Sequence, residues 1–124
     1  MRSPSMLLLA SAVATGLFGV GLLIAPGLLV SLYGLRLDGD GALVARLLAA
    51  QLLGFMVLDF TSRAATGASL RTVLVAGLVA EVVSVVVVTG AAATGAGNAL
   101  LCGVAALFGA FAVWRVLVLR ALRS

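Results

Sequence analysis

The chain has 124 residues, 64% of them hydrophobic and 10% charged, with a mean hydropathy of +1.32. Soluble domains are about half apolar, so this composition indicates an integral membrane protein whose length allows four crossings of about 20 residues and excludes an additional soluble domain. The net charge of +4 arises without histidine or lysine, which excludes imidazole ligands and Schiff bases. We therefore expect no cofactor, no metal site and no nucleic-acid partner.

The first two membrane-spanning helices are expected at about residues 6–32 and 42–62 of a single transmembrane domain, residues 1–124. Ser3 and Pro4 are typical of a helix start, whereas Pro26 should bend or end the first helix. The connector that follows is rich in turn residues, and its Asp38 or Asp40 can cap the second helix.

The third and fourth helices are expected at about residues 69–90 and 98–119. The third is rich in valine, a residue common in the strands of soluble proteins, but an apolar run this long forms a helix in lipid. Asn98 can cap the fourth helix. The predicted fold is all-α, a bundle of four transmembrane helices.

Charge placement predicts the orientation of this bundle. With alternating helices, six arginines fall on the side of the termini and two fall on the opposite side, beside Asp38 and Asp40. Cytoplasmic loops are enriched in arginine, so both termini should face the cytoplasm in a multi-pass protein of the cell membrane. The six are Arg2, Arg63, Arg71, Arg115, Arg120 and Arg123, and the two are Arg36 and Arg46. Tyr33 and Trp114 fit the two interfacial levels.

Small residues form stripes on two of the predicted helices, and such stripes mark close helix contacts in membranes. The same faces also allow a homo-oligomer. The first helix carries Ala12, Gly16, Gly19 and Pro26, and the fourth carries Asn98, Cys102, Ala105, Gly109 and Ala112.

Most charged residues within the spans have a simple structural interpretation. Asp59 precedes Arg63 by four residues, the favourable order for a local ion pair near the cytoplasmic interface. Arg115 either joins that pair or extends to the interface, and Arg46 can also reach the opposite interface.

Glu81 has no such interpretation. It lies about 15 Å beyond Arg71 along the helix, near the middle of a hydrocarbon core about 30 Å thick. No base lies on its own helix face, so it must meet a partner from another helix, line a wet cavity or be protonated. Gln51 lies at a comparable depth. A polar clasp between helices is one alternative, and a pocket opened by the small residues Gly77 and Ser84 is the other.

Residues 26–34, Pro-Gly-Leu-Leu-Val-Ser-Leu-Tyr-Gly, are followed by Ala45-Arg46 and Leu53-Gly54. This pattern resembles small four-helix bacterial membrane proteins of the DoxX-like kind. The resemblance implies a four-helix bundle and includes Arg46 in a motif, but it transfers no catalytic residue. Small multidrug-resistance transporters have a similar length and a glutamate in their first helix. The present first helix has no acid, and aromatic residues are sparse, which argues against that family.

Three functions are compatible with this pattern. The preferred one is a protein that binds a membrane lipid or another apolar or amphipathic small molecule, or assists a membrane partner, at Glu81, Gln51, Arg46, Gly77 and Ser84. The second is a membrane-embedded isomerase or cyclase with Glu81 as acid or base, and with Asp59 or Arg46 tuning the charge. The third is a small proton-coupled dimeric transporter in which Glu81 cycles a proton.

Overall fold

The computed structural model describes residues 3–123, and that part of the chain contains helices and no strand. Four helices are long and apolar enough to cross a membrane, which confirms the predicted all-α bundle. Arg2, which entered the charge count, lies outside the described residues. The helices are α1 Pro4–Ile24, α2 Pro26–Ser31, α3 Gly39–Thr61, α4 Gly67–Ala93 and α5 Ala99–Ala121, and a 3-10 turn, η1 Ser62–Ala64, follows α3.

Three helices begin where capping residues predict a start. The side chain of Ser3 accepts a hydrogen bond from the Met6 N–H at 3.4 Å. Asp38, one of the two proposed caps of α3, accepts from the Gly41 N–H at 2.6 Å, and Asn98 accepts from the Leu100 N–H at 3.0 Å. Each cap satisfies a backbone donor that the helix itself leaves unpaired.

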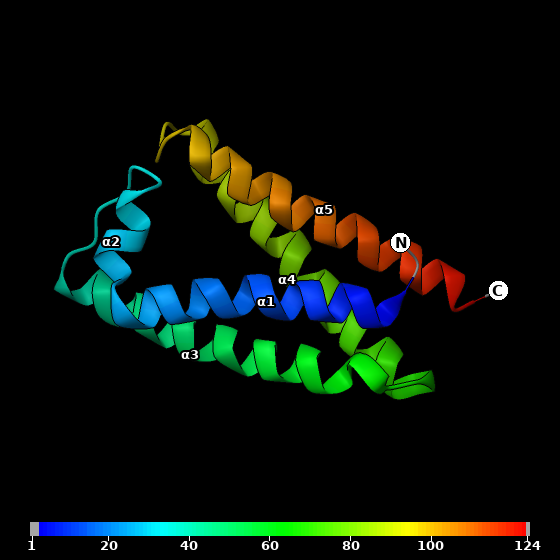
Figure 1. Cartoon of the computed structure of the whole chain (residues 1–124). Helices are drawn as coiled ribbons and strands as arrows, with labels where there is room; N and C mark the ends of the chain where they lie inside the picture. The colour runs from blue at the N-terminus through cyan, green and yellow to red at the C-terminus, as the bar shows by residue number, and fades with distance from the viewer. Residues whose placement is uncertain (1–2, 124) are drawn as a thin grey trace.

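The first apolar segment is not one helix to residue 32. It breaks at Ala25, where the backbone leaves the helical region with φ −140° and ψ 68°. Pro26 causes the break, because proline lacks an N–H and its ring clashes with the preceding turn. The short helix α2 therefore turns away from the axis of α1 and lies across one end of the bundle (Figure 1).

The long helices form two antiparallel pairs, α1 with α3 and α4 with α5 (Figure 1). In the first pair, a Cβ added to Gly16 would lie 3.3 Å from the Met56 Cγ, and one added to Gly19 would lie 3.1 Å from a Leu53 methyl carbon. The small stripe on α1 is thus a helix contact, as predicted. A Cβ added to Gly109 of α5 would meet nothing within 4 Å, so that position is not a close contact.

The two pairs cross obliquely and touch near both ends (Figure 1). At the end that holds the start of α1 and the end of α5, a buried apolar cluster joins α1, α4 and α5. Its members are Leu7, Leu8, Leu70, Leu74 and Val118. At the other end, the Asn98 side chain donates to the Leu32 carbonyl at 2.9 Å, and its N–H donates to the Tyr33 carbonyl at 2.8 Å. Between these two contact regions, the helix pairs lie apart.

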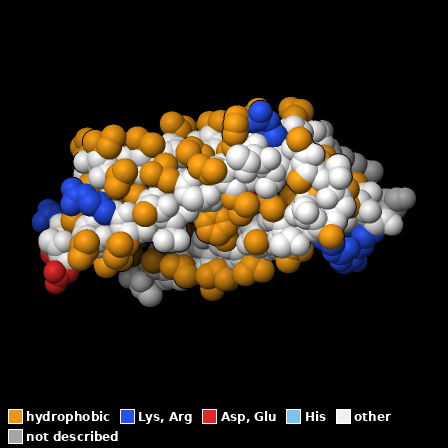
Figure 2. Space-filling view, turned by 90° about the horizontal axis from the view of Figure 1, so that it is seen from below, with side chains coloured by type: hydrophobic (Ala, Val, Ile, Leu, Met, Phe, Trp, Pro, Cys, Tyr) orange, Lys and Arg blue, Asp and Glu red, His pale blue; other side chains and the backbone are white. Residues whose placement is uncertain are grey.

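The outer surface is apolar over much of its length. Figure 2 shows hydrophobic side chains along the face seen from below, and the acidic side chains visible there lie at one end, next to basic ones. Exposed side chains such as Leu17, at 71%, and Val86, at 66%, belong to the middle of α1 and α4. A surface of this kind is suited to lipid rather than water.

Candidate functional site

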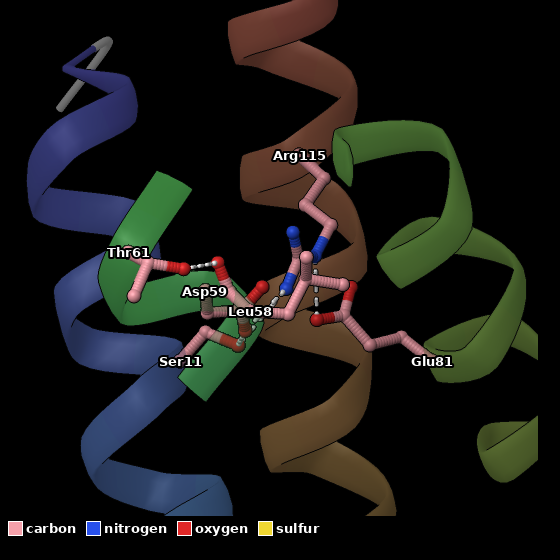
Figure 3. Close-up of polar contacts among 6 residues, drawn as sticks. All are labelled: Ser11, Leu58, Asp59, Thr61, Glu81 and Arg115. Carbon is pink, nitrogen blue, oxygen red and sulfur yellow. Dashed lines mark hydrogen bonds and ion pairs between the residues drawn. The ribbon is translucent and has the colours of Figure 1, made fainter. Parts of the chain in front are cut away.

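Arg115 of α5 is buried, with 2% of its surface exposed, and it contacts both helix pairs. Its Nε donates a hydrogen bond to Glu81 Oε1 at 2.7 Å, and its Nη2 donates to the Ser11 hydroxyl at 2.9 Å. The same Nη2 lies 3.5 Å from Asp59 Oδ2. Figure 3 shows the guanidinium group between Glu81 on one side and Ser11 and Asp59 on the other. Arg115 therefore connects the two pairs electrostatically.

Ser11 completes the contact on the α1–α3 side. Its hydroxyl donates to Asp59 Oδ2 at 2.6 Å while it accepts from Arg115, and a serine hydroxyl can do both at once. Ser11, Asp59, Glu81 and Arg115 are named here the Arg115 cluster. Each member comes from a different long helix, and all four are buried.

Gly77 makes room for the guanidinium group. A Cβ at this position would lie 2.6 Å from Arg115 Nη1 and 2.7 Å from Nε, closer than nonbonded atoms approach. Gly77 lies one helical turn before Glu81 on the same face, so the arginine side chain can pass α4 and reach the carboxylate. The smallness of Gly77, which suggested a pocket from the sequence, thus serves first to admit Arg115.

The cluster leaves unpaired groups and an uneven charge. Glu81 Oε2 and Arg115 Nη1 are buried and have no hydrogen-bond partner within residues 3–123. Two carboxyl groups also face one guanidinium group, so with all three ionised the cluster carries one excess negative charge. Unpaired buried polar atoms and uncompensated buried charge both cost free energy. The arrangement therefore favours binding of a further polar or charged group at these unpaired atoms.

A cavity of about 450 Å³ lies between the two helix pairs and borders the cluster. Its charged lining residues are Asp59, Glu81 and Arg115, and most of its other walls are apolar. Leu48 of α3 and Val83 and Val87 of α4 also line it, and all three are more than 50% exposed. These two helices are not a packed pair, so the cavity opens sideways between them, at the apolar surface.

The cavity brings together five of the six residues predicted for the site. Glu81 and Asp59 border it with Arg115, and Gln51, Gly77 and Ser84 form other parts of its wall. The partner of Glu81 is Arg115 rather than Gln51. The Ser84 hydroxyl donates to the Ala80 carbonyl of its own helix at 2.7 Å.

Arg46 lies elsewhere. It is exposed, its Nε donates to the Leu23 carbonyl at 3.4 Å, and it is not part of the cavity wall. The structure therefore does not bring Arg46 together with Glu81, because the Arg46 guanidinium group reaches the end of α1 instead.

The predicted ion pair between Asp59 and Arg63 is wrong. Both ion pairs within the described residues are made by Arg115, whereas the Arg63 guanidinium carbon lies 3.7 Å above the centre of the Phe60 ring. The helical spacing of Asp59 and Arg63 allows a local pair, but Asp59 faces the bundle interior and is 4% exposed. The alternative in which Arg115 meets Asp59 is the one observed.

Sequence reasoning missed Ser11 and did not join Arg115 to Glu81. The depth of Glu81 was estimated as if the third helix ran upright, but α4 crosses obliquely (Figure 1). Glu81 thereby contacts Arg115, about 9 Å before the end of α5, and Arg115 also contacts Asp59 in the last turn of α3. The sequence did contain a signal, because Glu81 has no base on its own face of the helix and Arg115 lies within an apolar helix.

No protein-family model, no curated protein and no solved structure matches the chain. The resemblance to DoxX-like proteins therefore stays a prediction, and the site is interpreted from its own geometry.

Proposed function

We propose that this chain is a small multi-pass membrane protein that binds an apolar or amphipathic small molecule in the cavity beside the Arg115 cluster. The observation that carries the proposal is an apolar cavity of about 450 Å³ with charged groups at its border. Small-molecule sites have volumes of about 300–1,000 Å³ and combine apolar walls with a few polar groups. The cavity has both properties.

The polar part of the ligand would face the cluster. Among residues 3–123, the acceptor Glu81 Oε2 and the donor Arg115 Nη1 have no hydrogen-bond partner, so a polar group placed there can form hydrogen bonds with both. Gln51 and Ser84 add polar atoms farther along the wall.

The apolar part of the ligand would extend away from the cluster. A second apolar cavity of about 500 Å³ shares Phe18, Leu22, Leu48 and Val104 with the first and reaches Tyr33 near α2. The adjoining volumes give room for an extended hydrocarbon group. Because the opening lies between the apolar faces of α3 and α4, such a molecule would enter from the lipid phase.

A photoreactive probe tests this proposal. A long-chain alcohol carrying a diazirine should label cavity residues saturably in the reconstituted protein, and excess unlabelled alcohol should compete. Ser84→Phe should lower this saturable labelling by about tenfold, because the ring fills the cavity without removing a cluster residue. Val86→Phe is the matched control, since Val86 lies on the same helix, is 66% exposed and is not part of the cavity wall.

The labelled residues are identified by mass spectrometry of peptides. Equal saturable labelling of both variants, or labelling confined to outward-facing residues, would exclude ligand binding in this cavity.

A second candidate, the acid–base isomerase or cyclase, is favoured by one observation. The structure brings a second carboxyl group, Asp59, to the same guanidinium group as Glu81, so a donor and an acceptor of protons border one cavity. Mass spectrometry of the small molecules that copurify separates the two candidates. A substrate together with its isomer supports the enzyme, whereas a single unchanged compound supports binding alone.

We also propose that both termini face the cytoplasm, as the arginine distribution indicates. Arg63, Arg71, Arg120 and Arg123 support this orientation, whereas Arg115 no longer contributes because it is buried. In a Cys102→Ser background, an impermeant maleimide should label Thr94→Cys in intact cells and should label Thr66→Cys only after permeabilisation. Both threonines are exposed and lie at opposite ends of α4. The reverse labelling pattern would invert the orientation.

A further inference from the structure

We infer that the molecule bound in this cavity is a lipophilic cation with a single positive charge. The inference rests on the proposed function, because it assigns a chemical class to the ligand of the same cavity. Two independent features carry it: the uneven charge of the Arg115 cluster and the aromatic lining of the cavity.

The charge at the cavity follows from the side chains that line it. α1 contributes no charged side chain, α3 contributes Asp59, α4 contributes Glu81 and α5 contributes Arg115. Arg63 of η1 and Arg71 near the start of α4 are the next basic residues along the chain, and both are exposed. Within the part of the chain that the structure describes, the lining therefore holds two carboxyl groups and one guanidinium group.

The backbone adds to the negative potential. Asp59 lies in the last turn of α3, which ends at Thr61, and the carboxyl end of a helix carries partial negative charge. An acid at that place is unfavourable unless a positive group is near. Arg115 Nη2 lies 3.5 Å from Asp59 Oδ2 but also donates to the Ser11 hydroxyl. The Nε of Arg115 donates to Glu81. One positive group thus serves two acids.

A buried excess charge needs compensation, either by a proton on one carboxyl group or by a cation. Glu81 Oε2 is buried, has no hydrogen-bond partner among the described residues and belongs to a residue that lines the cavity, which gives a cation an acceptor to approach. A small hydrated ion would lose its water against apolar walls that offer little in return. A positive charge carried by an apolar body matches both the cluster and the walls.

The walls also supply aromatic rings. Four of the five phenylalanines of the chain line the cavity, and they come from α1, α3 and α5. Aromatic faces attract cations, with a larger effect where the cation is desolvated. Four of the seven aromatic residues of the chain thus line this one cavity. They are Phe18, Phe55, Phe108 and Phe111.

The test compares two probes of similar shape and opposite charge, the tetraphenylphosphonium cation and the tetraphenylborate anion, bound to the full chain in detergent. Asp59→Asn removes one negative charge and retains an acceptor for the Ser11 hydroxyl and the Glu81–Arg115 pair. The binding of each probe is compared between the wild type and the variant. Partitioning of the probe into the micelle is the same for both proteins, so it cancels in this comparison.

Asp59→Asn should weaken cation binding by about tenfold or more, the size expected for a unit charge about 10 Å away at an effective dielectric constant of about 20, and should not weaken anion binding. Phe108→Leu, which leaves every charge in place, should weaken cation binding by about threefold or more. Circular dichroism and gel filtration check that each variant is folded.

Three results would overturn the inference. If Asp59→Asn binds the cation as tightly as the wild type does, a bound proton already neutralises the cluster. If the anion is preferred, the charge assignment is wrong, and the proposed cavity function stands because a ligand still binds. If neither probe binds and the diazirine alcohol gives no saturable labelling, both the inference and the proposed function fail.

Discussion

Arg115→Met is expected to lower the free energy of unfolding by about 3–5 kcal/mol, the cost of breaking a buried ion pair by removing one partner. The substitution leaves Glu81 and Asp59 buried without the guanidinium group that both contact at present. Methionine has a similar length and is apolar, so lost volume contributes little to the effect. The measurement is reversible unfolding in mixed micelles, followed by circular dichroism.

Arg120→Met is the control for this prediction, since Arg120 lies on the same helix and is exposed. Its free energy of unfolding should change by less than about 0.5 kcal/mol, as is usual for surface substitutions. Equal stability of the two variants would show that Arg115 is not an essential contact between the helix pairs.

The second large effect is expected at Gly77. Gly77→Ala places a Cβ 2.6 Å from Arg115 Nη1 and 2.7 Å from Nε, so the guanidinium group must move and its hydrogen bonds to Glu81 and Ser11 must lengthen. Overpacking of a filled interior costs about 1–3 kcal/mol, and we expect a loss in this range by the same unfolding measurement.

Gly90→Ala is the matched control for Gly77→Ala. Both glycines belong to α4, and a Cβ at Gly90 meets nothing within 4 Å. Alanine favours helix over glycine by up to about 1 kcal/mol, so this variant should be as stable as the wild type or slightly more stable. A Gly77→Ala variant that behaves like Gly90→Ala would place the arginine away from α4.

The helices were predictable because their causes are local. Apolar length, the caps Ser3, Asp38 and Asn98, and the effect of Pro26 each depend on neighbouring residues. The break at Ala25 was foreseeable in kind, but its extent was not, because the two residues that follow α2 accept hydrogen bonds from Asn98, the cap of α5. Those contacts join residues far apart in the sequence.

The site was predictable only in part, for a related reason. The absence of a base on the face of Glu81 left a partner from another helix as one of three alternatives, and Arg115 is such a partner. The identity of the partner depends on the oblique crossing of the helix pairs, which hydropathy and charge patterns do not encode. Asp59 was assigned to Arg63 because i, i+4 spacing is visible in a sequence, whereas the contact with Ser11 is not.

The Arg115 cluster explains why two helix pairs with few apolar contacts between them stay together around a cavity. The apolar cluster that includes Leu7 and Leu74 joins them at one end, and Asn98 joins them at the other. Between these points, charged hydrogen bonds in a region of low dielectric constant provide the connection. A ligand at the cluster would therefore influence how the pairs are held.

The most direct test of this account is a double-mutant cycle that combines Arg115→Met with Glu81→Gln. Residues in one ion cluster have interaction energies of about 0.5–3 kcal/mol, whereas distant residues give additive changes. We predict a coupling of at least about 1.5 kcal/mol between the two substitutions, measured from the free energies of unfolding of the wild type, both single variants and the double variant. Additive effects would contradict the account, because Arg115 and Glu81 would then not be partners in the folded protein.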